Sequence, residues 1–498
     1  MKKYISFLIC FATLLSLGAC NDWLDVKPST QMDRDELLSR EEGYAEAIKG
    51  VYTLMCKPTL YGRELTWGPI DVIAGYYQTI PYYTYNNLQS FSWVKGSSTA
   101  NTTAAELVGQ FWTGLYNAIA GLNSVLDVID DNKGIFTDDN YSLLKGEAMG
   151  LRAFLHFEVL RMFGDAYEKS RDKEVMPFVA GLSAGVAPML KGEDVITIVI
   201  SQLEEAVRLL ETDPMKLGTA PAKVLASIPA ISAANNIREW HNRRFHFNYY
   251  AAKATLARAY LWKGDKVNAL KMAREVIADQ QSRFPWAIDV NLSAIESGAG
   301  ADQDRTFATE HIFALNVTDM DNMISGFLNK SGETYENYLM LSRRDDLFTR
   351  EDERGVDPRY RFLYVQSAPE TFLLSKFYQP VSVAAYFKYR MPLIRISEMY
   401  YIAAECAPAW QDGLEYLETV RRNRGMGTLP LVNVNDPETL QGEIHDEYRK
   451  EFAGEGQLWF YYKRRQFTEL PFANMSFFSM DAYVFPRPEN EDLYGNRN

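Results

Sequence analysis

Helical periodicity is the feature of this sequence that most restricts its fold. Over much of the chain, apolar side chains recur every three or four residues, which places them on one face of a helix. The pattern predicts helices over residues 36–55, 106–129, 141–163 and 194–210. Gly164 directly follows the third helix, where a glycine in the left-handed conformation commonly ends a helix. In the fourth helix Glu204 and Arg208 lie one turn apart, so we expect them to form an ion pair.

Residues 250–277 contain a helical pair with a recognisable spacing. Ala257, Gly264 and Ala269 fall where a tetratricopeptide repeat has small residues, which let its two helices approach closely. Gly264-Asp265 is expected to form the turn. Further pairs are predicted for residues 393–407 with 413–424, and within residues 438–465. Because one pair cannot bury both of its faces, the pairs must stack. The sequence therefore predicts an all-α fold in which tetratricopeptide-like helical pairs form an α-superhelical scaffold.

The N-terminus carries an export and lipidation signal. Lys2 and Lys3 precede an apolar run of 13 residues, 5–17. This run is shorter than the roughly 20 residues that a membrane-spanning helix needs, and it fits a secretory signal peptide. It ends in Leu-Gly-Ala-Cys, the pattern at which a lipoprotein signal peptidase cuts once the cysteine carries a diacylglyceryl group. We expect a signal peptide over residues 1–19, a lipid anchor on Cys20 and a tether over residues 20–34; the alternative is an ordinary signal peptide with an incidental cysteine.

Charge and cysteine content exclude some partners and cross-links. Asp and Glu outnumber Lys and Arg by 65 to 52, a net charge of −13. This balance argues against nucleic acid as a partner, because phosphate backbones need a basic footprint. Four cysteines cannot supply a disulfide framework. Cys10 leaves with the signal peptide and Cys20 takes the lipid, so Cys56 and Cys406 remain; we expect two buried free thiols, and a disulfide between them is the alternative.

No catalytic or metal-binding motif stands out in the sequence. None of the five histidines has a zinc-type spacing. Neither a glycine-rich phosphate loop before a helix nor a G-x-S-x-G elbow is present. Carboxylates are abundant, so counting alone leaves a glycosidase pair open. We expect no enzyme activity, no cofactor and no metal site.

Two long irregular stretches, residues 59–103 and 284–389, interrupt the helical pattern. Long loops on a rigid frame commonly carry function. The first contains YYQTIPYYTYNNLQSFSW at residues 76–93, with seven aromatic side chains in 18 residues. Flat rings stack on the apolar faces of sugars while amides and carboxylates bond the hydroxyls, and each well-placed ring contributes on the order of 1 kcal/mol. The alternative is that these rings are the core of the loop.

Six motifs follow one another along the chain. The most specific reads Gly-Glu-Ala-x-x-Leu-Arg-Ala-Phe-x-His-Phe and is followed by Phe-Gly-Asp, at residues 146–157 and 163–165. The others are an Asp-Trp-Leu-Asp-x-x-Pro start, a Phe-Trp-x-x-Leu-Tyr-x-x-Ile-x-x-x-Asn helix and three later stretches, at residues 22–28, 111–123, 393–405, 420–425 and 447–460. In this order the motifs resemble those of the SusD/RagB family of outer-membrane lipoproteins. Residues 493–498 depart from the usual ending of the family.

The resemblance implies a single domain over residues 20–498, with helical pairs in an N-terminal part, 35–283, and a loop-rich C-terminal part, 284–498. It implies a protein held at the outer membrane by its lipid alone and exposed on the cell surface. Such a protein captures an oligosaccharide and, as a lid, delivers it to a SusC-like TonB-dependent transporter, with no bond made or broken by the lid itself.

Together with the ring-rich stretch, the resemblance leads us to expect ligand contacts from the loops. The expected stacking platforms are Tyr83, Tyr85 and Trp93. The expected hydroxyl partners are Asp71, Asn86 and Asn101, and a second set in the later stretch comprises Trp286 and Tyr335. By contrast, the charged motif residues are expected to be structural, in hydrogen bonds between neighbouring helices: Arg152, Arg395, Glu398, Arg424 and Glu455.

Two other classes of function stay open. One is the same lid role with peptides as cargo, for which an elongated cleft with few exposed rings would speak. The other is a surface glycoside hydrolase, which needs two carboxylates about 5–9.5 Å apart in one cleft. A scaffold or adhesin is a weaker fourth possibility.

Overall fold

The computed structural model describes residues 34–94, 102–183, 185–217, 243–287, 292–295, 301–328, 338–378, 380, 382–384, 386–471 and 478–495. The predicted signal peptide, the tether up to residue 33 and the lipidation site Cys20 lie outside these ranges, as do the predicted contacts Asn101 and Tyr335. None of the described helices is both long enough and apolar enough to cross a bilayer.

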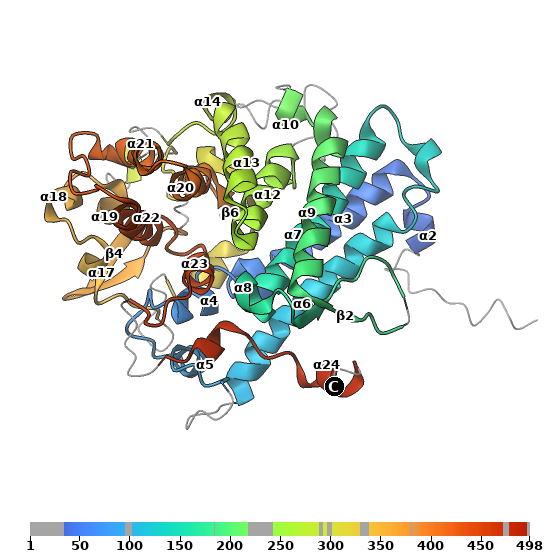
Figure 1. Ribbon diagram of the computed structural model, residues 1–498, viewed down its shortest axis with the longest axis horizontal. Coiled ribbons are helices and arrows are strands. Elements are labelled where there is room, and N and C mark those ends of the chain that lie inside the picture. The colour runs from blue at the N-terminus through green and yellow to red at the C-terminus, as the bar shows by residue number, and fades with distance from the viewer. Residues whose placement is uncertain are drawn as a thin grey trace, which may run out of the picture.

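A stack of antiparallel helices forms the frame of the molecule (Figure 1). Each helix of the stack packs against the next along the chain. The order is α3 (Glu41–Met55), α6 (Thr102–Leu126), α7 (Asn140–Phe163), α9 (Gly192–Leu209), α12 (Tyr249–Lys263), α13 (Lys266–Ala278), α20 (Ile396–Cys406), α21 (Trp410–Arg421) and α22 (Pro437–Glu451). The predicted scaffold of stacked helical pairs is therefore confirmed.

Shorter helices precede, connect and follow the members of this stack. They are α2 (Arg34–Leu37), α4 (Pro69–Ile73), α5 (Tyr83–Gln89), α8 (Tyr167–Ser170), α10 (Pro214–Leu217), α14 (Gln280–Arg283), α16 (Met320–Ile324), α17 (Arg344–Leu347), α18 (Glu351–Arg354), α19 (Pro358–Phe362), α23 (Leu458–Arg465) and α24 (Glu489–Tyr494). The predicted helix over residues 36–55 is interrupted, because Arg40 has an extended backbone between α2 and α3.

The α12–α13 pair folds as its sequence predicts. Gly264 ends α12 with φ +83°, a left-handed conformation that strains other residues. Asp265 then caps α13, where its carboxylate accepts a hydrogen bond from the Asn268 amide at 3.0 Å. Gly164, by contrast, has φ −89° and ψ 162°, so the predicted left-handed stop after α7 is wrong. Space is tight at Gly164, since a Cβ atom there would lie 2.9 Å from the Leu160 carbonyl oxygen.

The ion pair predicted between Glu204 and Arg208 is also wrong. Arg208 binds Glu205 instead, with its Nε 2.7 Å from Oε2. The Glu204 carboxylate accepts a hydrogen bond of 2.6 Å from the Tyr260 hydroxyl on the neighbouring α12. A tertiary partner outside the helix thus decides between two local pairings that helix geometry allows equally.

Within the described ranges, three two-stranded antiparallel sheets interrupt the otherwise helical fold. The pairs are β1 (Glu174–Pro177) with β2 (Met189–Lys191), β3 (His311–Asn316) with β6 (Arg390–Arg395), and β4 (Tyr364–Ala368) with β5 (Thr371–Leu374). β6 takes the first three residues of the helix predicted over 393–407, so that α20 begins only at Ile396. Pro392 lies in β6, where it lacks the amide that a helix would need.

A buried group of charges joins the C-terminal half of the fold, and we call it the ionic cluster. Its cations and carboxylates are each at most 4% exposed and are paired with one another. They are Arg359, Lys376, Arg395, Arg421, Arg424 and Lys450 with Glu310, Glu353, Asp357, Glu447, Glu451 and Glu455.

Glu451 is the centre of the ionic cluster. Its carboxylate binds Arg359 at 2.9 Å, Arg424 at 2.6 Å and also Arg395. Burial alone would raise the pKa of Glu451, but the three guanidinium groups hold it well below its usual range. The structural role predicted for Arg395, Arg424 and Glu455 is thus confirmed.

Candidate functional site

The two long stretches that the sequence left without regular helices meet in space. Thr79 of the first pairs with Met340 of the second as an isolated β-bridge. The Gln78 side-chain oxygen accepts hydrogen bonds from the Ser342 and Arg343 amides, at 3.1 and 3.3 Å. The loops therefore form one continuous surface, supported by the helical stack.

One part of this surface is an aromatic face made by Arg63, Tyr82, Tyr83 and Phe327. Tyr83 is 68% exposed, and the other three side chains are half-buried. The Tyr82 and Phe327 rings meet edge to face at 5.8 Å, and the Arg63 guanidinium lies 5.3 Å from the centre of the Phe327 ring. Of the residues predicted as platforms, Tyr83 is the one with an open ring.

Tyr85 supports the aromatic face from below and does not reach solvent. It is 1% exposed, and its hydroxyl donates a hydrogen bond of 2.7 Å to Glu64. The same carboxylate binds Arg63 at 2.6 Å, so Glu64 compensates the charge of Arg63. The structure thus corrects the prediction that Tyr85 is a stacking platform: its ring packs 5.9 Å from Phe327 inside the loop.

Asp71, predicted to bond ligand hydroxyls, is also inside the protein. It is fully buried at the start of α4, and its carboxylate accepts hydrogen bonds from the amides of Gly454 at 2.6 Å and Gly456 at 3.1 Å. Both glycines have positive φ, which turns their amides toward the carboxylate. Burial raises the pKa of Asp71 well above its usual value, against the opposing effect of these amides. Asp71 fastens the first loop to the ionic cluster and leaves no atom for a ligand.

Trp93 borders an open hollow that we call the C-terminal groove. The groove has a volume of about 1180 Å³ and runs between α6 and the chain segment 481–492. Trp93 is 6% exposed and packs edge-on against Phe485 at 5.8 Å. Phe485 anchors the segment by inserting beside Phe163 of α7, at 6.0 Å. Ligand pockets commonly measure about 300–1,000 Å³, so this groove has room for an oligosaccharide.

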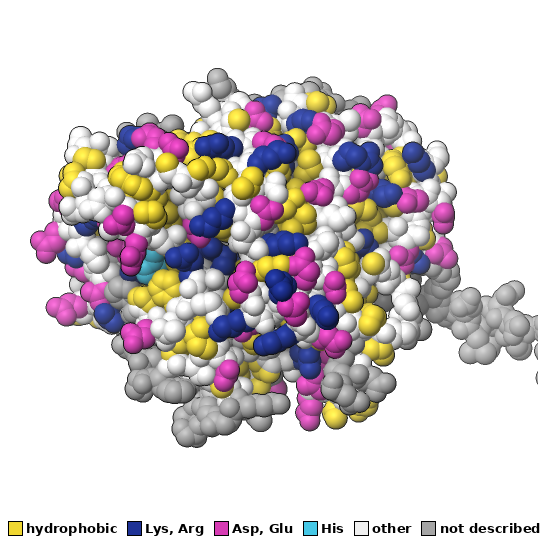
Figure 2. Space-filling view, in the orientation of Figure 1, with side chains coloured by type: hydrophobic (Ala, Val, Ile, Leu, Met, Phe, Trp, Pro, Cys, Tyr) yellow, Lys and Arg dark blue, Asp and Glu magenta, His cyan; other side chains and the backbone are white. Residues whose placement is uncertain are grey.

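Polar side chains line the α6 wall of the groove. Gln110, Thr113 and Asn117 are exposed and lie three and four residues apart, so they share one helical face. Amide and hydroxyl groups both donate and accept hydrogen bonds, as sugar hydroxyls do. The opposite wall carries Asp481 and Arg487. Figure 2 shows acidic side chains over α24, at the lower edge of the view.

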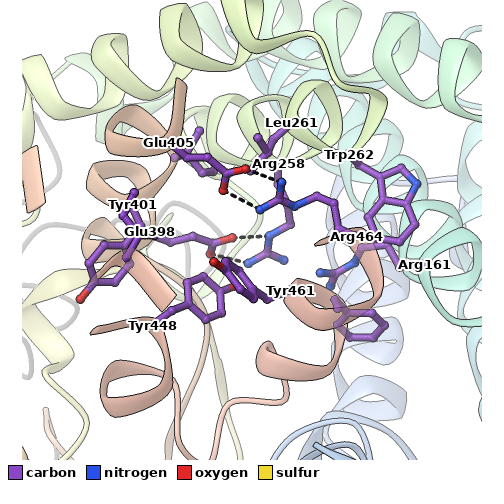
Figure 3. Close-up of a pocket in the computed structure, with 13 residues that line it drawn as sticks. Arg161, Arg258, Leu261, Trp262, Glu398, Tyr401, Glu405, Tyr448, Tyr461 and Arg464 are labelled. Atoms are coloured by element: carbon purple, nitrogen blue, oxygen red, sulfur yellow. Dashed lines mark hydrogen bonds and ion pairs between the residues drawn. The ribbon is translucent and has the colours of Figure 1, made fainter. Parts of the chain in front are cut away.

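A second hollow lies between α12, α20, α22 and α23 (Figure 3). Its volume is about 40 Å³, enough for a few water molecules and too small for a sugar. Its charges are paired: Arg258 binds Glu398 and Arg464 binds Glu405, each at 2.6 Å. This hollow belongs to the packing between helices, which agrees with the structural role predicted for Glu398.

Other predicted residues lie apart from the groove. Asn86 is exposed on α5, and its side-chain amide donates a hydrogen bond of 3.2 Å to the Ile80 carbonyl. Trp286 is half-buried, 5.2 Å from Tyr400 and beneath the guanidinium of Arg424, so it borders the ionic cluster. The motif residue Arg152 is buried and binds Asn123 and the Ala180 carbonyl, as expected of a structural side chain.

Within the described ranges, no cluster of three or more His, Cys, Asp or Glu side chains could hold a metal ion. Cys56 and Cys406 are free thiols, as the sequence predicts, although Cys56 is only partly buried. Burial raises the pKa of both thiols to about 12, which keeps them protonated and unreactive.

Part of the aromatic face and most of the groove could not be recognised from the sequence. Gln110, Thr113 and Asn117 carried a signal, namely polar residues recurring on one face of a predicted helix. Arg63 and Phe327 carried none, because they meet only when the two loops pack together. Arg487 likewise borders the groove only because Phe485 folds the C-terminal segment back onto α6 and α7.

The structure defines a class of helical-repeat proteins. In this class, helical pairs stack and their loops form one open surface. Known proteins share this architecture. A family model described as "Starch-binding associating with outer membrane" matches residues 22–261, and the model of the SusD family matches residues 364–497. The chain belongs to the SusD/RagB family.

Individual relatives are distant in sequence and similar in fold. The SusD-like protein P38 of Formosa agariphila is 20% identical over 489 residues, covering 92% of this chain and 91% of the relative. The crystal structure of a SusD-like carbohydrate binding protein from Bacteroides vulgatus has a TM-score of 0.68 at 18% identity and covers 92% of this chain and 97% of its own. A laminarin binding SusD-like protein has a TM-score of 0.62 at 16% identity, with 92% and 97% covered.

Proposed function

We propose that this chain is a cell-surface lipoprotein that binds an oligosaccharide and, as a lid, delivers it to a SusC-like TonB-dependent transporter. The observation that carries the proposal is the C-terminal groove, where an indole side chain and a row of amides and hydroxyls border a hollow large enough for several sugar rings. Membership of a family described as starch-binding, and the likeness to a laminarin binding protein, support a glycan as the ligand.

The site residues of the proposal are those that reach solvent or the groove. Trp93 forms the apolar wall, and Gln110 and Asn117 bond hydroxyls. Tyr83 offers an exposed ring on the same loop surface. Asn86, Asn101, Trp286 and Tyr335 stay predicted contacts, whereas Asp71 and Tyr85 are removed from the set because they are buried.

Calorimetry on the soluble chain starting at residue 21 tests the binding. We expect one of a panel of neutral glycans, including laminarin and starch oligosaccharides, to bind. The double variant Gln110→Ala/Asn117→Ala should weaken that binding by about 10-fold, since each lost hydrogen bond contributes roughly 0.5–1.5 kcal/mol. The matched control, Gln281→Ala/Gln411→Ala, removes two amides that are exposed on helices away from the groove. An equal loss of glycan affinity in both double variants would show that the glycan does not bind in the groove.

The proposed lid role and the proposed location at the outer membrane need a different experiment. The wild-type chain should fractionate with the outer membrane and co-purify with a TonB-dependent transporter. The variant Cys20→Ala should leave the membrane fraction, because the lipid is its proposed anchor. Incubation of the protein with the bound glycan should release no shorter products; products would favour the hydrolase alternative.

A further inference from the structure

The described charges that border the C-terminal groove are predominantly negative. Glu106 on α6, Asp481, and Glu489 and Asp492 of α24 contribute four carboxylates. Arg487 is the one cation among the described lining residues, and Asp492 already binds it, with Nη2 2.8 Å from Oδ1. Three carboxylates of the groove therefore have no cationic partner among the described lining residues.

The aromatic face offers no uncompensated cation among its described residues either. Arg63 is its charged member, and Glu64 binds both its Nε and its Nη2 at 2.9 and 2.6 Å. The whole chain adds a net charge of −13, so the long-range field also repels anions.

From this arrangement we infer that the groove selects uncharged glycans and rejects sulfated or uronate-rich ones. The inference rests on the proposed function, since it specifies the ligand of the same groove. Hydroxyl groups of neutral sugars can donate hydrogen bonds to the three carboxylates. They can both donate hydrogen bonds to the side-chain amides of Gln110 and Asn117 and accept hydrogen bonds from them. A sulfate ester or a uronate group brings no donor for a carboxylate, and its own negative charge meets like charges that no unpaired cation offsets among the described lining residues.

Paired calorimetric titrations test the inference. The soluble chain is titrated with a neutral polymer, laminarin, and with the same polymer after sulfation; starch oligosaccharides are compared with oligogalacturonate in the same way. At about 20 mM salt the acidic polymer should bind at least about 10-fold more weakly than its neutral counterpart, and the gap should narrow at about 500 mM salt because the charges are then screened.

The possible results of these titrations distinguish the inference from the proposed function. Equal or tighter binding of an acidic polymer would overturn the inference and leave the proposed function in place. Failure of every glycan in the panel would overturn both. Binding of neutral glycans with rejection of the acidic ones supports both.

A charge-neutralised variant locates the effect. The triple variant Glu106→Gln/Asp481→Asn/Glu489→Gln should reduce the discrimination against sulfated laminarin by about 5-fold or more. The matched control, Glu46→Gln/Asp172→Asn/Glu415→Gln, changes the net charge equally at exposed ion pairs outside the groove and should leave the discrimination unchanged. If both variants relax it equally, overall charge and not the groove is responsible, and the inference fails.

Discussion

The ionic cluster and the C-terminal groove are both rich in charged side chains, but the two regions differ in how these charges are exposed and paired. In the ionic cluster every side chain is at most 4% exposed and lies in an ion pair with a neighbour. In the groove the carboxylates are exposed, and Glu106, Asp481 and Glu489 have no cation beside them among the described lining residues. A buried charge must be paired because desolvation is costly, whereas an exposed charge needs no partner and can meet a ligand.

This difference explains why the motifs of the family do not identify its ligands. Arg395, Arg424 and Glu455 come from the motifs, and all three lie in the ionic cluster. Thr113 and Asn117 lie in the α6 motif at positions that the motif leaves open, and both face the groove. The charged motif residues in the cluster stabilise the frame, whereas the proposed ligand contacts lie between motif positions, where a side chain can change without disturbing the frame.

The largest expected effect comes from breaking the ionic cluster at its centre. Glu451→Gln should lower the free energy of unfolding by about 3–5 kcal/mol, because it leaves Arg359, Arg395 and Arg424 buried without their shared carboxylate. Urea denaturation followed by circular dichroism measures the loss. The control Glu205→Gln breaks an exposed pair with Arg208 and should cost less than about 1 kcal/mol. Similar losses in both variants would contradict the contrast drawn between buried and exposed charge.

Asp71 lies in the first loop and bonds the backbone next to the ionic cluster, so its variants show whether it contributes to stability or to glycan binding. Asp71→Ala should destabilise the fold by about 2–3 kcal/mol, because two buried amides lose their acceptor. Asp71→Asn keeps one oxygen and should cost less. Neither change should alter the glycan affinity of the folded protein, as titration at a temperature well below the unfolding transition would show. A specific loss of affinity would return Asp71 to the site.

The buried side chain of His156 is expected to make the stability of the fold depend on pH. Its Nδ1 lies 2.9 Å from the Arg152 carbonyl and its Nε2 accepts a hydrogen bond from the Val179 amide at 3.0 Å, so the folded protein holds a neutral ring. Burial lowers the pKa of His156 to about 3, from 6.5. Between these values the unfolded chain binds one proton more, so stability falls as the pH falls, by roughly 1–2 kcal/mol between pH 6.5 and 5.

Unfolding curves at a series of pH values measure this slope. In His156→Gln the contribution of this residue should disappear, while the absolute stability also drops because the ring packs at 3.8 Å on Phe178. An unchanged slope in the variant would show that another group titrates in this range.

The smallest effect sharpens the description of the ligand surface. Tyr83→Ala should leave stability unchanged, since the ring is 68% exposed, and should weaken glycan binding by about 2- to 5-fold if the ligand extends from the groove to the aromatic face. Tyr378, 41% exposed in the second loop, provides the control variant Tyr378→Ala. An unchanged affinity in Tyr83→Ala would confine the ligand to the groove.

Sequence patterns predicted the frame well and the site only in part. The α12–α13 pair and its Gly264 turn follow from periodicity and local turn chemistry, and the bounds of α7 follow from periodicity, although Gly164 ends α7 without the left-handed conformation predicted for it. The start of α20 was predicted too early, because the pairing of β6 with β3 is a contact between residues far apart in the chain. In the ring-rich loop, composition could not tell Tyr85, which is buried, from Tyr83, which is exposed.

The sequence by itself determined the stack of helical pairs, because the pattern depends on spacing along a helix. It also predicted a structural role for the charged motif residues and favoured free thiols over a disulfide. Only the tertiary structure decided that Asp71 bonds Gly454 and Gly456, that Phe327 joins the first loop, and that the C-terminal segment forms a wall of the groove. The reason is physical: helix periodicity is a local property, whereas the exposure of a loop side chain depends on which distant segment packs against it.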